Sequence, residues 1–372
     1  YHNADASGIK FVPFLSVSPV GFRNIKDAAI DLFAPEVFLT GENGQGKTNI
    51  LESLYMISYG SSFRTKNDAE IIRSGEDSYG IRGFYKDENG KADTIAIQYA
   101  KSAGKKKLLK NGKVLTDRKD LIQTIPCVLF CHDDLDFAVG EPERRRFFID
   151  QSLSMYDVLY IDVLRKYKKV LKSRNTLLRE ERIDMLDIYD IELVKNGLTI
   201  VKKRNEALFR FNRIFAPLYE EVTGIDKVSI AYDSSWKEKK EEEIVALLQE
   251  KRQNDIVMKT TLSGPHRDRI RFMRHQQPFI PTASTGQRRL AAILLRVCQA
   301  VLYTETVSKK PVLLMDDVLL ELDIAKRERI TALLPQYDQL FCTFLPEEPY
   351  ARYKRSSTKV YEVKNGVLTP SA

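Results

Sequence analysis

One short segment, Gly41-Glu-Asn-Gly-Gln-Gly-Lys47-Thr48, limits the possible folds more than any other part of the sequence. It completes the pattern GxxxxGK[ST] of phosphate-binding loops. A short apolar run, Glu36–Thr40, precedes it, and apolar residues recur at three- and four-residue steps after Thr48, which predicts strand, loop and helix in succession. The glycines let backbone N–H groups face phosphate oxygens, and the positive end of the following helix adds to the field. In such a loop Lys47 reaches the β and γ phosphates of ATP, and Thr48 offers a hydroxyl ligand to Mg²⁺. The alternative is a chance Gly-rich turn, which matches this pattern in about one chain in a hundred at ordinary composition.

A second feature supplies the carboxylates that an ATP site needs. The run Val312-Leu-Leu-Met-Asp316-Asp317 is apolar up to its two acids, as expected of a strand buried in a parallel sheet. We predict that Asp316 holds Mg²⁺ and that Asp317 orients the attacking water. Apolar strands often end in aspartate, so the assignment depends on the loop. Most of the chain lies between Lys47 and Asp316, which predicts a large insertion.

The sequence patterns change twice along the chain. Strands and turns fill the first 130 or so residues, including a hairpin that pairs 81–85 with 94–99 and a second hairpin that turns at Asn111-Gly112. From Glu141 to about Val222, glycine and proline become scarce and the apolar spacing becomes heptad-like. This spacing predicts three or four packed helices.

Together these patterns predict an α/β fold with an inserted helical lobe. The expected α/β lobe combines residues 1–132 with residues 291–372, and the helical lobe takes residues 133–290. Strand-like and helical patterns return after about Thr260, and a charged stretch, 237–252, is predicted to form a surface helix.

The charge balance limits the kind of partner. The chain has 59 Lys and Arg against 51 Asp and Glu, a formal charge of +8 and a pI near 9.0, which favours a polyanion such as nucleic acid over a membrane. The richest apolar stretch, 291–303, is interrupted by Arg296, so we expect no segment that spans a bilayer. Four cysteines are too few for a disulfide framework, and the first residues lack the order of a signal peptide, so we expect a cytoplasmic protein.

A third motif separates the families that share this loop. Ser284-Thr-Gly286-Gln287-Arg-Arg289 opens an apolar helix ahead of Asp316 and resembles the signature motif of ABC-type ATPases. In those proteins the signature Ser and Gly bind the γ-phosphate of ATP that the other subunit holds. The resemblance therefore implies a homodimer closed around two ATP molecules. Taken alone, Ser284 reads as an ordinary helix N-cap.

The motifs as a set resemble the RecF family of bacterial recombination mediators, an ABC-type P-loop ATPase head related to SMC and Rad50 proteins. The resemblance implies ATP and Mg²⁺ binding, slow ATP hydrolysis, and binding to double-stranded DNA, including gaps. It also implies action with RecO and RecR to load RecA, in DNA replication, recombination, repair and the SOS response. The segments that carry it are Phe22-Arg-Asn24, the loop from Gly41 to Glu52, Ser62-Phe-Arg-Thr65, Gly140 to Arg146 with Asp150, Tyr167 to Asn175, Gly264 to Asp268 and Asp316 to Asp323.

Four positions depart from the usual pattern of that family. Leu320 stands where the D-loop, which continues as Glu321-Leu322-Asp323, normally has Ser or Ala, so communication between two ATP sites could differ. His132 replaces a usual Pro, and Arg269 replaces a usual acid. Similarity assigns Thr343 to the place of the ABC switch histidine.

These arguments yield one set of predicted site residues. Asp317 and Lys47 are the predicted catalytic residues, and Thr48 and Asp316 are the predicted metal ligands. For DNA, Lys105, Lys106 and Lys107 on an exposed hairpin can meet backbone phosphates, and Arg64 follows the phosphate-loop helix; solvated side chains are a comparable alternative. The predicted ATP-binding residues are Gly41, Glu42, Asn43, Gly44, Gln45, Gly46, Lys47, Thr48, Asn49, Ser284, Gly286 and Gln287.

Two other charged motifs invite interpretation. Gly264-Pro-His-Arg-Asp268 places His beside Arg and Asp, and we favour a structural or interlobe role over a catalytic one. Arg144-Arg-Arg146 opens a helix, where cations oppose the helix dipole, so we expect partners for it, either carboxylates or phosphates.

Three rival functions share parts of the pattern. A nucleotide-binding DNA scaffold with negligible turnover would keep every motif, and Leu320 keeps that alternative open. The nucleotide-binding subunit of an ABC transporter would need a membrane partner and would not need the RecF-like segments. A P-loop kinase of small molecules has no use for the motif at Ser284.

Overall fold

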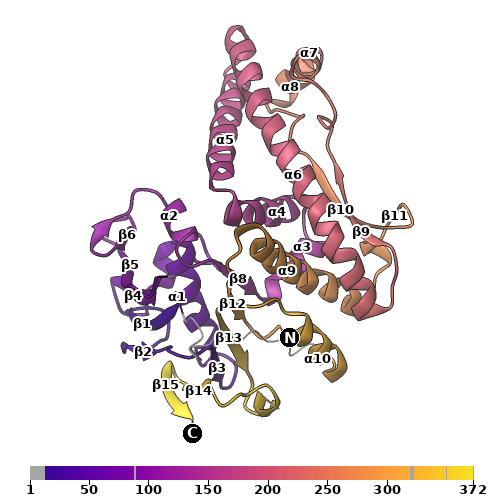
Figure 1. Cartoon of the computed structure of the whole chain (residues 1–372). Coiled ribbons are helices and arrows are strands. Elements are labelled where there is room, and N and C mark those ends of the chain that lie inside the picture. The colour runs from indigo at the N-terminus through magenta and orange to yellow at the C-terminus, as the bar shows by residue number, and fades with distance from the viewer. Residues whose placement is uncertain (1–12, 88, 319–321, 349, 372) are drawn as a thin grey trace. The chain divides into compact units, whose positions relative to one another are not determined.

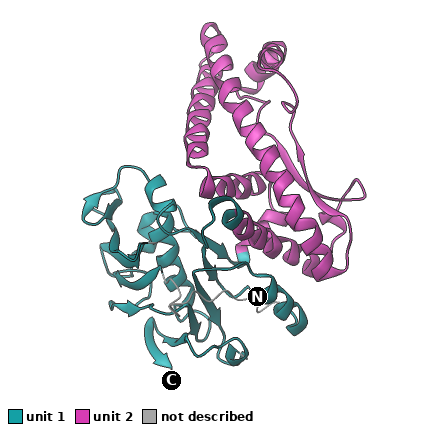
Figure 2. Ribbon diagram, viewed as in Figure 1, with its two compact units in different colours: residues 1–132, 303–372 teal, residues 133–302 magenta. Residues whose placement is uncertain are grey.

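The computed structural model describes residues 13–87, 89–318, 322–348 and 350–371. Its contacts divide the chain into two compact units, residues 1–132 with 303–372 and residues 133–302 (Figure 2). Unit 2 ends at residue 302, whereas the helical lobe was expected to end at residue 290, and that lobe boundary stays a prediction. Leu320 and Glu321 lie outside the described residues.

A six-stranded sheet of unit 1 carries the phosphate-binding loop. Its order is β15-β14-β3-β13-β12-β8, and all neighbours are parallel except β14 and β15 (Figure 1). Strands β3, β8, β12 and β13 are buried along their whole length, which explains why apolar residues predominate in them. The strands are β3 (Glu36–Thr40), β8 (Cys127–Phe130), β12 (Val312–Met315), β13 (Gln339–Phe344), β14 (Thr358–Lys364) and β15 (Val367–Ser371).

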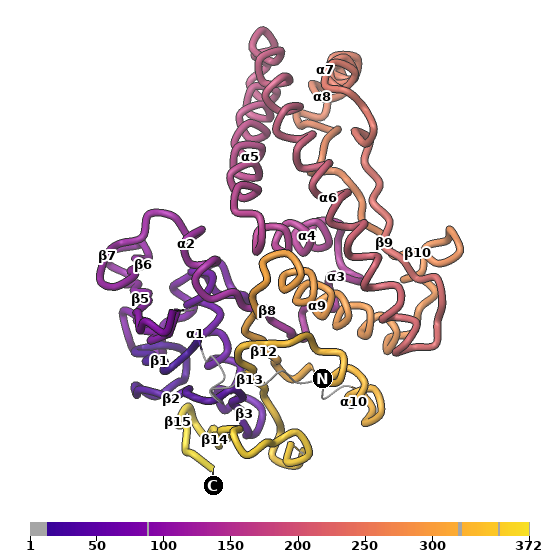
Figure 3. Tube along the Cα trace, viewed as in Figure 1, coloured from indigo at the N-terminus to yellow at the C-terminus, as the bar shows by residue number. Residues whose placement is uncertain are grey.

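The second sheet of unit 1 is antiparallel, in the order β2-β1-β4-β5-β6-β7 (Figure 3). Ile81 pairs with Ile97 in the first predicted hairpin, and Asn111-Gly112 turns between β6 and β7, so both hairpins are confirmed. The strands are β1 (Phe14–Val20), β2 (Ile30–Asp31), β4 (Ser78–Lys86), β5 (Ala92–Ala100), β6 (Lys107–Lys110) and β7 (Lys113–Val114).

Helix α1 (Lys47–Tyr59) packs against strands of both sheets and forms the centre of the core of unit 1. Ten of its residues are buried, so the helix is enclosed on most sides. It ends at Gly60, whose left-handed φ of 67° suits glycine. Short helices complete the unit: η1 (Asp68–Ile71), α2 (Lys119–Ile122), α10 (Ile324–Leu333) and η5 (Tyr350–Arg352).

Unit 2 is mainly helical, as predicted, and contains a small antiparallel sheet in the order β11-β10-β9. The predicted block forms α4 (Pro142–Tyr156), α5 (Val158–Arg179) and α6 (Leu186–Thr223), in which α5 packs along α6. The predicted surface helix is α7 (Glu241–Glu250), which begins later than expected. The other elements are α3 (Leu135–Val139), η3 (Ile183–Met185), β9 (Val228–Asp233), α8 (Arg252–Met258), β10 (Arg269–Arg274), β11 (Gln277–Pro278) and η4 (Ile280–Thr282). Two elements cross the boundary between the units: η2 (His132–Asp134) begins at the residue that precedes unit 2, and α9 (Thr285–Val307) continues into unit 1 with residues 303–307.

Helix α9 is long and apolar enough to cross a membrane by length and composition alone. However, 72% of its most apolar window is buried inside the protein. Arg296 is buried within it and forms a 2.7 Å ion pair with Asp134. These are the properties of a helix in a protein core, which can have the length and composition of a membrane-spanning helix.

Candidate functional site

The phosphate-binding loop connects β3 to α1 and depends on its glycines. Gly44 and Gly46 have φ of 78° and 120°, which side-chain-bearing residues rarely adopt. A Cβ atom on Gly46 would lie 2.8 Å from Ile25 Cδ1 and 2.9 Å from Asn24 Oδ1. The loop therefore has room for backbone only at this point.

Lys47 lies inside the loop with 4% of its surface exposed. Its Nζ donates hydrogen bonds to the carbonyl oxygens of Gly41 at 2.6 Å and Glu42 at 3.1 Å. The curled backbone thus wraps around the ammonium group. This is the position from which a lysine can reach phosphate oxygens in front of the loop.

Thr48 and Asp316 meet although most of the chain separates them. Thr48 Oγ1 donates a 2.9 Å hydrogen bond to Asp316 Oδ1, because β3 and β12 are parallel strands of one sheet that end at the same edge. Burial, and then the neighbouring charge of Asp317, raise the pKa of Asp316 to about 6. A hydroxyl and a carboxylate form the oxygen donor set that suits Mg²⁺.

Asp317 is held by a threonine of the adjacent strand. Its backbone N–H donates to Thr343 Oγ1 at 2.8 Å, and that hydroxyl donates to Asp317 Oδ1 at 2.7 Å. Thr343 is 3% exposed on β13, and Asp317 adopts a left-handed φ of 52°. The two contacts fix both the backbone and the carboxylate of Asp317, so Thr343 belongs to the geometry of the site.

A chain of side-chain hydrogen bonds connects the loop to Arg64. Asn24 Nδ2 donates to the carbonyl of Gly44 at 3.1 Å, and Asn49 Nδ2 donates to Asn24 Oδ1 at 2.7 Å. Arg64 Nη1 then donates to Asn49 Oδ1 at 2.7 Å. Through Asn49 and Asn24, Arg64 is therefore connected to the phosphate-binding loop.

Glu52 on α1 anchors this chain of contacts. The carboxylate is fully buried and accepts hydrogen bonds from Arg23 at 2.7 and 2.9 Å. Arg64 lies 3.5 Å from it, and the hydroxyl of Ser62 also donates to it. Sequence reasoning missed Glu52 and Asn24 as site residues. The sequence did contain a signal for Glu52, which is an acid on the mainly apolar helix that follows Lys47. Because a buried unpaired charge is costly, an acid at this position predicts a nearby cation.

A cavity of about 540 Å³ lies beside the phosphate-binding loop. Gly41, Glu42 and Gln45 line it together with Tyr350 and Glu362. Gln45 also connects the loop to the β14–β15 turn, since its side-chain oxygen accepts from the N–H of Asn365 at 2.7 Å. Among the loop residues predicted to bind ATP, Glu42 and Asn43 have exposed side chains.

The signature residues lie in unit 2, at the start of α9. The backbone N–H of Ser284 donates to Gln287 Oε1 at 2.8 Å, and the N–H of Gln287 donates to Ser284 Oγ at 3.2 Å. This reciprocal pair is a capping box, so the N-cap interpretation of Ser284 is confirmed. Ser284 and Gly286 are also exposed, and no atom lies within 4 Å of a Cβ built on Gly286. The cap therefore leaves the helix N-terminus accessible.

The predicted DNA-binding lysines differ in their surroundings. Lys105 and Lys107 are exposed on the hairpin. Lys106 is 9% exposed by side chain, and its Nζ forms a 2.7 Å ion pair with Asp68. The ammonium group of Lys106 thus already has a carboxylate partner within unit 1.

The motif from Gly264 to Asp268 lies inside unit 2. His266 Nδ1 lies 2.6 Å from Tyr167 Oη, and its Nε2 lies 3.0 Å from the carbonyl oxygen of Thr261. Burial lowers the pKa of His266 to about 4, so the ring is neutral, with Nε2 donating to the carbonyl and Nδ1 accepting from the tyrosine. Asp268 accepts from Tyr232 Oη. These contacts give the motif a packing role.

The arginine run at the start of α4 has its partners within unit 2. Arg145 donates to the carbonyl of Ile270 at 3.1 Å, and Arg146 donates to the carbonyl of Asp268 at 2.8 Å. Arg144 lies 3.6 Å from Asp136. Two of these arginines thus bind backbone carbonyls, which we had not predicted, because main-chain partners leave no pattern in a sequence.

Comparisons with known proteins agree with this geometry. The family model described as RecF/RecN/SMC N terminal domain matches residues 16–369. The chain is 49% identical over 354 residues to the DNA replication and repair protein RecF of Treponema pallidum, covering 94% of this chain and 99% of that protein. It is 32% identical over 356 residues to the protein of the same name from Leptospira interrogans, covering 94% and 97% of the two chains.

Solved structures give the same result for the fold. A structure described as the recombination mediator protein RecF-ATP in the RecFOR pathway matches with a TM-score of 0.88 and 26% identity, covering 98% of this chain and 99% of the other. An Smc head bound to the C-terminal winged-helix domain of ScpA matches with a TM-score of 0.58 and 14% identity, covering 96% and 97% of the two chains, and shows the fold alone. The predicted ABC-type head, related to SMC proteins, is confirmed.

Proposed function

The chain belongs to the RecF family of DNA replication and repair proteins, and on that premise we propose that it is an ATP-dependent DNA-binding recombination mediator. The observation that carries the proposal is the hydrogen bond between Thr48 and Asp316, which joins the two halves of an ATP site from distant parts of the chain. The RecF relative whose structure is described with ATP supports the same ligand.

In this proposal the loop from Gly41 to Asn49 holds the triphosphate. Its N–H groups and the N-terminus of α1 face the phosphates, and Lys47 exchanges its carbonyl partners for β- and γ-phosphate oxygens. Thr48 and Asp316 hold Mg²⁺, which neutralises phosphate charge when bound. The raised pKa of Asp316 fits this role, because a cation would compensate the buried carboxylate.

Asp317 is the proposed water-orienting residue for a slow ATPase. Its carboxylate follows Asp316 at the edge of the sheet and is fixed by Thr343. Once ATP is bound, the carboxylate would accept a hydrogen bond from the attacking water and turn its lone pair towards the γ-phosphate.

Two subunits would complete each site. Ser284, Gly286 and Gln287 would present the exposed N-terminus of α9 to the γ-phosphate held by the partner, so ATP would favour an ATP-dependent homodimer. The dimer would bind double-stranded DNA through exposed cations such as Lys105 and Lys107, and Arg64 would respond to nucleotide or DNA. RecO and RecR are the proposed protein partners, RecA loading is the proposed outcome, and the cytoplasm is the proposed location.

The test is the anisotropy of a labelled duplex titrated with protein in ATP and in ADP. We expect tighter binding in ATP, loss of that difference in Lys47→Met, and intact ATP binding without dimerisation in Ser284→Arg. Equal DNA binding in both nucleotides would contradict the nucleotide-gated mechanism. ATP-dependent DNA binding without measurable hydrolysis would favour the scaffold function instead.

A further inference from the structure

The antiparallel sheet of unit 1 has an inner face, which belongs to the core, and an outer face with exposed side chains (Figure 1). Helix α1 packs on the inner face, where Ile81 and Ile95 are buried. Successive side chains of a strand point to opposite faces, so the residues between these lie on the outer face. Among them Arg82, Phe84 and Gln98 are exposed. The outer face thus combines a cation, an aromatic ring and an amide.

This outer face is hollowed where its side chains are small. A cavity of about 650 Å³ opens there, over strands β1, β4 and β5. Gly80 pairs with Val20 on one neighbouring strand and with Gln98 on the other, and Ala96 pairs with Arg82. A Cβ atom built on Gly80 would meet no atom closer than 3.9 Å. The small residues therefore form a floor between larger side chains.

The apolar side chains of the hollow are open to solvent. Val20 is 54% exposed and Phe84 is 37% exposed, and both line the hollow. A ligand in the hollow can therefore cover both side chains, and removal of apolar surface from water favours its binding. The ring of Phe84 also offers a surface on which a planar group can stack.

Three cations border the hollow: Arg82, Lys105 and Lys107. All three are exposed, and no carboxylate in the described part of the chain lies within 4 Å of their charged nitrogens. The described residues that line the hollow include no acid. The hollow therefore has a positive charge that the protein itself does not neutralise, as a site for a polyanion requires.

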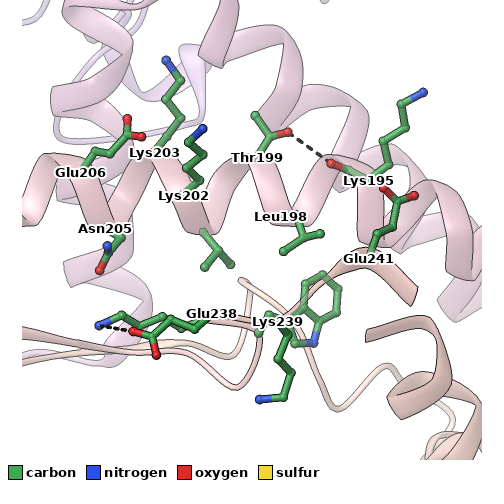
Figure 4. A pocket seen from close by; sticks show the side chains of 13 residues that line it. Lys195, Leu198, Thr199, Lys202, Lys203, Asn205, Glu206, Glu238, Lys239 and Glu241 are labelled. Atoms are coloured by element: carbon green, nitrogen blue, oxygen red, sulfur yellow. Dashed lines mark hydrogen bonds and ion pairs between the residues drawn. The ribbon is translucent and has the colours of Figure 1, made fainter. Parts of the chain in front are cut away.

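A second cavity has a different charge pattern. It is a cleft of about 780 Å³ in unit 2, between α6 and the segment that connects β9 to α7 (Figure 4). Its lining combines lysines with Glu206, Glu238 and Glu241, which would repel a polyanion. Of these two cavities, the hollow on the sheet is the one that suits a polyanion.

We infer that the hollow binds single-stranded DNA at the point where an unpaired strand leaves a duplex. The inference rests on the proposed DNA binding, because Lys105 and Lys107, the proposed contacts of the duplex, also border the hollow. An unpaired base would cover Phe84 and Val20, and the adjacent phosphates would pair with Arg82 and the lysines.

The exposed apolar side chains favour a single strand over a duplex in the hollow. A duplex that lies on the lysines presents phosphates and sugars, which would leave Val20 and Phe84 uncovered. A single strand presents the faces of its bases as well, and these stack on aromatic side chains of a sheet. Gln98 can then both donate and accept hydrogen bonds at the edge of a base.

The test uses the full chain in ATP and the anisotropy of three labelled DNAs. They are a blunt duplex, the same duplex with a single-stranded thymine tail, and the same duplex with a tail of equal length that lacks bases. We expect the thymine tail to raise the affinity about tenfold over the blunt duplex, because bases as well as phosphates gain contacts. The tail without bases should give a smaller gain, because it keeps only its phosphates.

The double variant Arg82→Ala with Phe84→Ala should lose about tenfold in affinity for the thymine-tailed duplex. Its matched control is Phe33→Ala with Lys86→Ala, which removes the same kinds of side chain from the same unit. These two residues lie outside the lining of the hollow, and the ammonium group of Lys86 lies 5.5 Å from the centre of the Phe33 ring. Both variants should bind the blunt duplex equally, and circular dichroism checks that they fold.

The outcomes separate this inference from the proposed function. Equal affinity of the wild-type protein for the three DNAs, or for the two kinds of tail, would overturn the inference and leave duplex binding in place. Equal weakening in the control variant would also overturn it. Tail-independent DNA binding, together with binding of an aspartate-rich peptide that only Arg82→Ala with Phe84→Ala abolishes, would assign the hollow to a protein partner. Absence of binding to every one of the DNAs would refute the proposed DNA binding itself.

Discussion

Replacing Thr343 by valine tests how the site positions Asp317. Valine keeps the shape of the buried side chain and removes only the hydroxyl that accepts from the N–H of Asp317 at 2.8 Å and donates to its carboxylate at 2.7 Å. The variant also removes the longer contact of 3.4 Å between Thr343 Oγ1 and Asp316 Oδ1, but it leaves in place the contacts of Lys47 with the loop and of Thr48 with Asp316. It therefore separates positioning of the attacking water from binding of ATP.

The expected magnitude follows from these two contacts. A hydrogen bond to a charged group contributes about 1.5–3 kcal/mol, and the N–H of Asp317 would lose its partner in a half-buried position. If that energy keeps the carboxylate in its productive position, its loss lowers the rate of ATP hydrolysis by about ten- to a hundredfold. The affinity for ATP should change by less than about threefold, as expected of a contact needed in the transition state and not in the ground state.

Single-turnover hydrolysis and equilibrium binding of a fluorescent ATP analogue measure the two quantities separately. Thr343→Ser keeps the hydroxyl and should restore most of the rate, and Asp317→Asn sets the level expected when the carboxylate is lost. Hydrolysis at the wild-type rate in Thr343→Val, alongside a slow Asp317→Asn, would refute the positioning argument. A wild-type protein that hydrolyses no ATP would instead refute the proposed ATPase function.

Three further predictions concern stability and the loop. The pKa of Asp316 is raised to about 6, above its unfolded value, so the stabilising contribution of this group is present at low pH and is lost as the pH rises through 6. Asp316→Asn should therefore raise the free energy of unfolding by about 1–3 kcal/mol at neutral pH and weaken Mg²⁺-dependent ATP binding. Calorimetry without nucleotide would show no gain in stability if burial of the carboxylate costs nothing. The pKa of His266 is lowered to about 4, below its unfolded value, so the free energy of unfolding should fall by about 3 kcal/mol as the pH drops from 6.5 to 4. In urea titrations at several pH values, His266→Gln should flatten this dependence of stability on pH. An unchanged dependence would exclude the imidazole ring as its source. Gly46→Ala should destabilise the loop by about 1–3 kcal/mol, because φ is 120° at this position. Calorimetry should detect the loss of stability, and ATP binding should be weaker. Wild-type stability and affinity would show that the loop tolerates a Cβ atom.

The elements that could be predicted from the sequence are those that depend on a local pattern of residues. The glycine spacing before Lys47, the apolar run up to Asp316 and the capping pair at Ser284 each fit within one short segment, so periodicity and residue type identify them. The hairpins of the antiparallel sheet were predictable for the same reason, since their strands are neighbours in the chain. The strand β9 was not predicted, because its partner β10 lies far along the sequence.

The contacts between residues far apart in the chain could be seen only in the folded protein. Parallel pairing of β12 with β13 brings Thr343 to Asp317, and packing of α1 between two sheets buries Glu52 beside Arg23. The lysine run at 105–107 looked uniform in sequence, yet Lys106 is paired with Asp68 while its neighbours are exposed. The physical reason is that burial and partner choice depend on long-range contacts, which a local pattern of residue types does not encode.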